Sequence, residues 1–137
     1  MKTVFADTGY WIALVNPNDE LHQQAKSLTS RLMPLKIMTS EMVLTELLNA
    51  FSGKGAIFRQ TSVQLTNQII SAPEIEIIPQ TSALFKSALE LYEQRSDQAW
   101  SHTDCTSFLI MQQREILEAL AHDKHFEQAG FIALLRQ

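Results

Sequence analysis

Four acidic residues stand at points in the chain from which they could do chemistry together. Asp7 directly follows a short apolar run in VFADTGYW, and Asp123 follows another in LEALAHDKHF. If both runs are parallel strands, both acids lie at the carboxyl edge of the sheet, where α/β proteins bind their ligands. Glu46 lies one turn into a predicted helix, and Asp104 begins the helix that leads into the strand before Asp123. The sequence therefore predicts four carboxylates at one edge of a sheet.

Each of these acids also has a purely structural explanation. Asp7 and Asp123 could be helix N-caps. Asp104 follows Ser101 by three residues in SHTD, which is the spacing of a capping box. Glu46 could belong to an ordinary solvated helix face. Their combination favours chemistry, because converging carboxylates repel one another at neutral pH unless some are protonated or a cation lies among them.

The ligand types in this acidic set indicate which cation to expect. Carboxylate oxygens suit Mg²⁺ or Mn²⁺, and no Cys/His set at zinc spacing is present. Ca²⁺ stays an alternative, although the loop spacing of an EF-hand is absent. Such ions activate water and stabilise a pentacovalent phosphorus, so phosphodiester hydrolysis is the natural chemistry. The net charge of -4 gives no general attraction to nucleic acid. A polyanionic substrate would therefore need the cation or a local basic patch.

Length and composition limit the kind of protein that this chain can be. Its 137 residues, 45% of them hydrophobic, predict a single domain over residues 1–137 with a buried core. No run approaches the roughly 18 apolar residues of a membrane span, so we expect no membrane association. The N-terminal segment lacks the pattern of a secretory signal, which predicts a cytoplasmic protein. The lone Cys105 is expected to be a small buried hydrophobic residue.

Apolar runs and helical periodicity alternate along the chain. The runs predict five strands: Thr3 to Ala6, Leu35 to Met38, Ile75 to Ile78, Ile116 to Ala121 and Phe131 to Leu134. The periodic stretches predict six helices: Gly9 to Val15, Asp19 to Met33, Ser40 to Phe51, Ser62 to Ser71, Ser82 to Arg95 and Thr103 to Gln113. The segment GKGAIFRQTS fits either a loop or a continued helix. This alternation indicates an α/β sandwich with a mostly parallel sheet.

Further polar residues lie near the four acids in the sequence. The Thr8 hydroxyl could contact a metal-bound water or simply bond the backbone, and Asp97 could lie near the site or in a solvated loop. Three basic residues could bind phosphates along a groove, or could be scattered surface charges: Lys54, Arg59 and Lys124.

Three histidines, His102, His122 and His125, flank two of the acids in the sequence. They could act as a base or as metal ligands, although four carboxylates are already available. We therefore expect at most a substrate contact, from His125.

Four ordered blocks cover nearly the whole chain: FADTGYWIAL, TSEMVLTELLNAF, SHTDCTSFLIMQ and ALAHDKHFEQAGF. In order and spacing they resemble the PIN-domain family, in particular the VapC-like ribonuclease toxins of prokaryotic toxin–antitoxin pairs. The resemblance implies that Asp7, Glu46, Asp104 and Asp123 are the metal-binding acidic quartet of that family. It also implies a three-layer α/β/α sandwich around a five-stranded parallel sheet, Mg²⁺- or Mn²⁺-dependent endoribonuclease activity on RNA, a homodimer and an antitoxin protein as inhibitor.

Three functional hypotheses remain distinct at this point. The leading one is a metal-dependent endoribonuclease that is the toxin of a toxin–antitoxin pair. The second is a PIN-fold module that binds RNA or protein without cutting it. The third is another α/β phosphohydrolase with Asp7 as covalent nucleophile. Gly9 stands where such enzymes carry a second Asp, which argues against the third.

Overall fold

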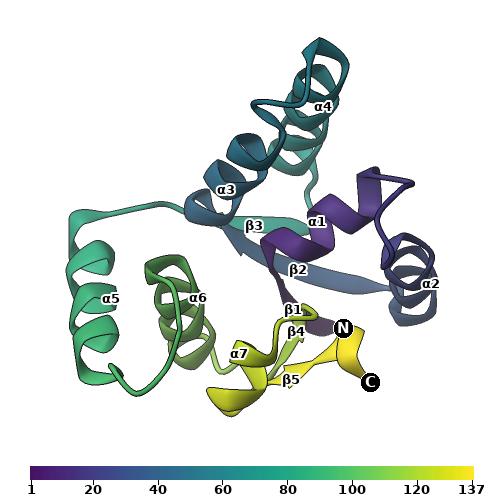
Figure 1. Cartoon of the computed structure of the whole chain (residues 1–137). Helices are drawn as coiled ribbons and strands as arrows, with labels where there is room; N and C mark the ends of the chain where they lie inside the picture. The colour runs from purple at the N-terminus through teal and green to yellow at the C-terminus, as the bar shows by residue number, and fades with distance from the viewer.

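The computed structural model describes all 137 residues, with strands and helices alternating along the chain (Figure 1). The strands are β1 (Lys2–Ala6), β2 (Leu35–Ser40), β3 (Ile75–Ile78), β4 (Glu118–Leu120) and β5 (Ile132–Ala133). The helices are α1 (Thr8–Val15), α2 (His22–Leu32), α3 (Glu41–Phe51), α4 (Ala56–Ser71), α5 (Ser82–Gln94), α6 (His102–Gln113) and α7 (Lys124–Gln128), and the 3-10 turn η1 (Leu134–Arg136) follows β5.

All five strands are parallel and lie in the order β3-β2-β1-β4-β5. The central strand β1 pairs with β2 through Phe5 and Met38, and with β4 through Phe5 and Ala119. The chain adds strands outward from β1 to β3 and then returns to the other side of β1 for β4 and β5. The switch in direction therefore falls between β1 and β4, and a crevice for ligands is expected at the carboxyl ends of these two strands.

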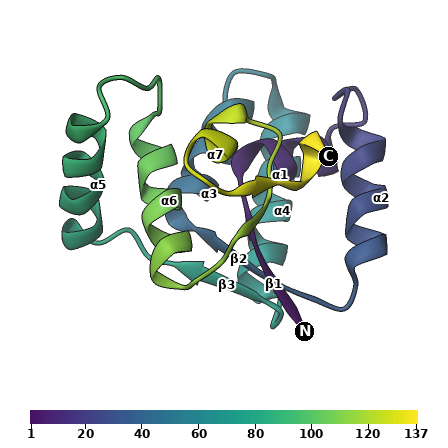
Figure 2. The same cartoon turned by 90° about the horizontal axis from the view of Figure 1, so that it is seen from below.

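The helices form two groups, one on each face of the sheet (Figures 1 and 2). In the first group α1 contacts α2 and α3, and α3 contacts α4; in the second, α6 contacts both α5 and α7. Right-handed crossovers place the two groups on opposite faces, because the direction of strand addition reverses after β3. The result is the three-layer α/β/α sandwich with a five-stranded parallel sheet that the sequence predicts.

The core lies between the sheet and these helices, and α6 is the helix most enclosed by it. Eight of its twelve residues are buried, from Thr103 to Met111. Phe108 contacts the rings of Trp100 and Phe126 edge-on, at 5.0 and 5.1 Å between centroids. The N-terminal turn of α6, which carries Asp104, is consequently fixed by packing on several sides.

The predicted elements agree with the structure except at particular ends. All five strands are present, but β4 and β5 are shorter than predicted because their flanking residues turn away into loops and into η1. The segment GKGAIFRQTS, which fitted either a loop or a helix, is a short loop followed by the first turns of α4. The helix begins after Gly55, a residue with a φ of 96°. The short helix α7 was not predicted. No helix has the combination of length and apolar character that crossing a membrane requires.

Candidate active site

Asp7 directly follows the central strand, at the start of α1. It occupies the N-cap position of α1, yet its side chain makes no capping hydrogen bond. Its backbone N–H donates to the carbonyl of Leu120 at 3.2 Å, which ties the end of β1 to the end of β4. The structural explanation of Asp7 as a helix cap therefore fails, and the acid lies at the switch point of the sheet.

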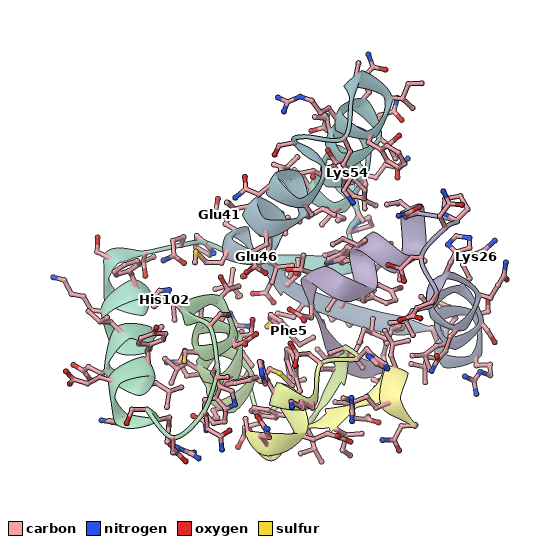
Figure 3. All side chains as sticks on the ribbon, in the orientation of Figure 1. Phe5, Lys26, Glu41, Glu46, Lys54 and His102 are labelled. Atoms are coloured by element: carbon pink, nitrogen blue, oxygen red, sulfur yellow. The ribbon has the colours of Figure 1, made fainter.

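Glu46 approaches this point from α3. The N-cap of that helix is Ser40, whose hydroxyl accepts a hydrogen bond from the N–H of Val43. The buried residues of α3, Leu47 among them, form an apolar stripe that faces the core. Glu46 is half-buried at the side of this stripe. The Thr8 hydroxyl donates to Glu46 Oε1 at 2.7 Å. Figure 3 shows Glu46 on α3, beside the start of α1.

Asp104 is positioned by the capping box that its sequence predicts. Its backbone N–H donates to Ser101 Oγ, and its Oδ2 accepts from the N–H of Ser101, both at 3.0 Å. Oδ1 of Asp104 accepts no hydrogen bond from the protein. Since only one carboxylate oxygen serves the cap, capping and metal binding are compatible in this residue.

Asp123 and His125 belong to α7 and meet Asp104 in space. Asp123 caps α7 by accepting the N–H of His125 at Oδ1, at 2.9 Å. Nδ1 of His125 hydrogen bonds with Asp104 Oδ2 at 3.0 Å and lies 3.2 Å from Asp123 Oδ1. The three side chains offer ligand atoms that lie within 4.8 Å of one another.

The electrostatics of Asp7 link all four acids. The pKa of its carboxyl group is raised from 3.8 to about 7, mostly by burial, and the N–H of Thr8 offsets part of this rise. The charges of Asp104, Glu46 and Asp123 contribute to the rise, in that order. Four carboxylates thus act on one another at this edge of the sheet, and Asp7 holds a proton up to neutral pH when nothing positive balances them.

The two secondary residues named from the sequence have different places in the structure. Thr8 lies in the site through its bond to Glu46. Asp97 does not join the acids: both of its carboxylate oxygens accept hydrogen bonds from Arg95, at 3.0 and 3.1 Å, and its side chain is 61% exposed. Closeness in sequence to Asp104 did not bring it into the site because the turn before α6 leaves it on the surface.

Of the three basic residues, Lys124 is nearest to the acids in the chain, and it is exposed beside Asp123 at the start of α7. Lys54 and Arg59 are exposed at the α3–α4 connection. Lys54 lies over the Phe51 ring, 5.9 Å from its centroid, and Arg59 donates to the carbonyl of Ser52. The ammonium group of Lys54 and the guanidinium group of Arg59 thus already contact residues of the α3–α4 connection.

The histidines separate into one that belongs to the site and two that do not. His102 points toward α5, where Nε2 lies 3.0 Å from the Phe85 carbonyl. His122 is exposed, and only its carbonyl is engaged, by Arg136. His125 has a larger place in the site than its sequence context indicated. The signal that could have revealed it is Asp123 followed two residues later by His125, since an N-cap acid faces the first turn of its helix.

The donor set fits a hard divalent cation. The ends of β1 and β4 and the helices α3 and α6 each contribute a carboxylate. Asp104 and Asp123 offer ligand atoms within 4.8 Å of each other, and the charges of Asp104, Glu46 and Asp123 all contribute to the raised pKa of Asp7. Mg²⁺ and Mn²⁺ are the ions that prefer such ligands. Cys105 is buried and offers no alternative thiolate ligand, because burial and the charge of Asp104 raise its pKa.

Comparison with known proteins agrees with this fold. The PIN domain family matches residues 4–132, and the chain belongs to that family. Among its relatives is the 23S rRNA-specific endonuclease VapC20 of Mycobacterium tuberculosis, which is 33% identical over 132 residues, covering 94% of this chain and 95% of that protein.

Solved structures give the same result for the fold. The crystal structure of Mycobacterium tuberculosis VapC20, described as a toxin that cleaves the sarcin-ricin loop, superposes with a TM-score of 0.85 at 29% identity, over 94% of this chain and 96% of that one. VapBC2 from Rickettsia felis, bound to a promoter DNA fragment, matches with a TM-score of 0.64 at 15% identity, over 97% of each chain. FitAcB from Neisseria gonorrhoeae matches with a TM-score of 0.64 at 13% identity, over 97% and 95%. The last two likenesses show the fold alone.

Proposed function

We propose that this protein is a metal-dependent endoribonuclease and the toxin of a toxin–antitoxin pair. The observation that carries the proposal is the convergence of Asp7, Glu46, Asp104 and Asp123, with Asp7 uncapped and its pKa raised to about 7 by burial and by the other three acids. Kinship with a 23S rRNA-specific endonuclease at 33% identity supports the choice of RNA as substrate.

The four acids are the residues that would hold Mg²⁺ or Mn²⁺. Such a cation makes water a stronger nucleophile at neutral pH and stabilises negative charge on the attacked phosphate. The protein contributes orientation: Thr8 directs Glu46, and the Ser101 capping box directs Asp104. These bonds fix the acids before substrate arrives, which lowers the reorganisation that the reaction requires.

Charge explains why an acidic protein can bind RNA at this place. The carboxylate cluster alone repels phosphates, but a bound divalent cation reverses the local field. Lys124 adds a positive charge next to Asp123, and Lys54 and Arg59 are further candidates for phosphate contacts along the α3–α4 hairpin. We therefore assign these three residues to substrate binding.

The assembly and setting of the protein follow from the same proposal. The structural relatives include the VapBC2 assembly of Rickettsia felis, and the toxin assignment implies a small antitoxin that inhibits this chain. We further propose a homodimer that acts in the cytoplasm, where its RNA substrate is found.

The direct test is RNA cleavage by the purified protein. A 23S rRNA fragment that contains the sarcin-ricin loop is incubated with Mn²⁺, with Mg²⁺ or with EDTA, and an unrelated RNA of equal length is the control. We expect specific cuts that require the metal. Binding of RNA without any cut in either metal would favour the rival hypothesis of a PIN-fold binding module.

A further inference from the structure

His125 sits between two of the proposed metal ligands that come from different helices. Nδ1 is 3.0 Å from Asp104 Oδ2, on α6, and 3.2 Å from Asp123 Oδ1, at the start of α7. The imidazole is only 18% exposed, and the carboxylate of Asp104 only 12%. This side chain is therefore enclosed between the acids and does not project freely into solvent.

The direction of these hydrogen bonds is determined by chemistry. An ionised carboxylate can only accept, so Nδ1 of His125 carries the hydrogen and donates it to Asp104 Oδ2. The same oxygen also accepts the N–H of Ser101. Asp104 Oδ2 is thus occupied twice, and Oδ1 is the oxygen left for a cation.

Asp123 shows the same division of its two oxygens. Oδ1 accepts the backbone N–H of His125 at 2.9 Å and lies against Nδ1, whereas Oδ2 accepts no hydrogen bond from the protein. His125 therefore engages one oxygen of each acid, Asp104 through its imidazole and Asp123 through its backbone N–H with the imidazole alongside, and leaves each acid a single free oxygen. Ligand orientation of this kind by an outer hydrogen-bond donor is a general feature of metal sites.

The position of His125 is itself held firmly, which a positioning role requires. Its neighbour Phe126 is fully buried, and the ring of Phe126 meets Phe108 of α6 at 5.1 Å between centroids. Trp100 Nε1 also donates to Gln128 Oε1 at 3.0 Å. These contacts join α7 to α6, the two helices that the imidazole bridges.

From this geometry we propose that His125 is a positioning residue that orients Asp104 and Asp123 for monodentate binding of a divalent cation. The inference rests on the proposed function and deepens it. Two other roles would use the same side chain differently: a direct nitrogen ligand, or a contact to the RNA substrate.

Two amide variants separate these roles. The amide nitrogen of Asn lies as many bonds from the backbone as Nδ1 does, so His125→Asn keeps a donor where Asp104 needs one. The amide nitrogen of His125→Gln corresponds to Nε2 and loses that donor. His122→Ala, which removes an exposed imidazole three residues away, is the control. Thermal unfolding of each variant verifies that it is folded.

Mn²⁺, Mg²⁺ and Ni²⁺ binding is measured by titration calorimetry without RNA, and cleavage kinetics are measured at saturating Mn²⁺. We expect His125→Gln to lower the affinity for Mn²⁺ and for Mg²⁺ by a similar factor of about 10 to 100, as the loss of a hydrogen bond to a metal ligand does. His125→Asn should recover most of this loss, His122→Ala should match wild type, and KM for RNA should stay constant while kcat falls in His125→Gln.

Unchanged metal affinity in His125→Gln would overturn the positioning role. A loss confined to Ni²⁺, which prefers nitrogen ligands, would show a direct ligand instead, and a raised KM with intact metal binding would show a substrate contact. If wild type itself bound no Mn²⁺, the proposed function would fail first, and the two failures are thereby distinguishable.

Discussion

Thr8 and Glu46 are joined by a 2.7 Å hydrogen bond from the threonine hydroxyl to Oε1, across 38 positions of sequence. Thr8 is the first residue of α1 and follows Asp7 directly, while Glu46 lies in the middle of α3. The bond therefore couples the acid at the end of β1 to the acid that comes from α3. The Thr8 hydroxyl thus contacts a carboxylate, which is neither the backbone nor the metal-bound water considered from the sequence.

Loss of this bond should impair activity more than stability. In Thr8→Val the shape is kept but the donor is removed, so Glu46 loses its orientation, and we expect metal-dependent cleavage to fall by about tenfold or more. Thr8→Ser retains a hydroxyl and is the matched control, with activity near that of wild type. Equal cleavage rates for Thr8→Val and Thr8→Ser at subsaturating Mn²⁺ would show that the bond is irrelevant to the site.

The raised pKa of Asp7 predicts how the metal-free protein responds to pH. An acid whose pKa rises on folding binds its proton more tightly in the folded state, so stability falls as pH increases from about 4 to about 7. Asp7→Asn removes this titration. In EDTA, we expect the variant to be more stable than wild type above pH 7, by up to about 4 kcal/mol.

This advantage should shrink as the pH is lowered and vanish below about pH 4, where Asp7 is protonated in both folded and unfolded states. Urea unfolding at several pH values measures it. A stability difference between Asp7→Asn and wild type that does not change with pH would contradict the assigned pKa. Added Mn²⁺ should stabilise wild type and leave the variant much less affected.

Lys124 offers a test of the substrate contacts. If its ammonium group binds a phosphate, Lys124→Ala should raise KM for RNA with little change in kcat, and should reduce the slope of log affinity against log salt by about 1. Lys26→Ala is the control because Lys26 is exposed on α2, well away from Glu46 in Figure 3. Identical salt slopes for the two variants would remove Lys124 from the substrate site.

The fold was largely predictable because its signals are local. The strands consist mostly of apolar residues, as expected where helices cover both faces, and Ser40 and Ser101 mark helix starts by their side-chain chemistry. Helix α7 escaped prediction because its five residues are too few to show a periodic pattern. The α4 start was ambiguous because Gly55 suits a loop and a helix boundary equally well.

The candidate site was predictable only where strand order determines position. Asp7 and Asp123 follow β1 and β4, which are neighbours in the sheet, so their closeness follows from topology. The closeness of His125 to Asp123 is local, but its contact with Asp104 depends on how α7 packs on α6, which sequence spacing does not encode. Asp97 illustrates the converse, since its partner is the neighbouring Arg95 and not the acids. The metal ligands and phosphate contacts stay predictions.

The central claim is that the four acids form a metal-dependent ribonuclease site, and Asp7 is its most direct test. Cleavage of sarcin-ricin loop RNA by wild type and by Asp7→Asn is followed over a Mn²⁺ titration, with circular dichroism to compare their folds. Asp7→Asn removes the carboxylate at the end of β1, so we expect it to abolish metal-dependent cleavage while the variant stays folded. Full cleavage by Asp7→Asn, or cleavage by wild type that persists in EDTA, would contradict this account.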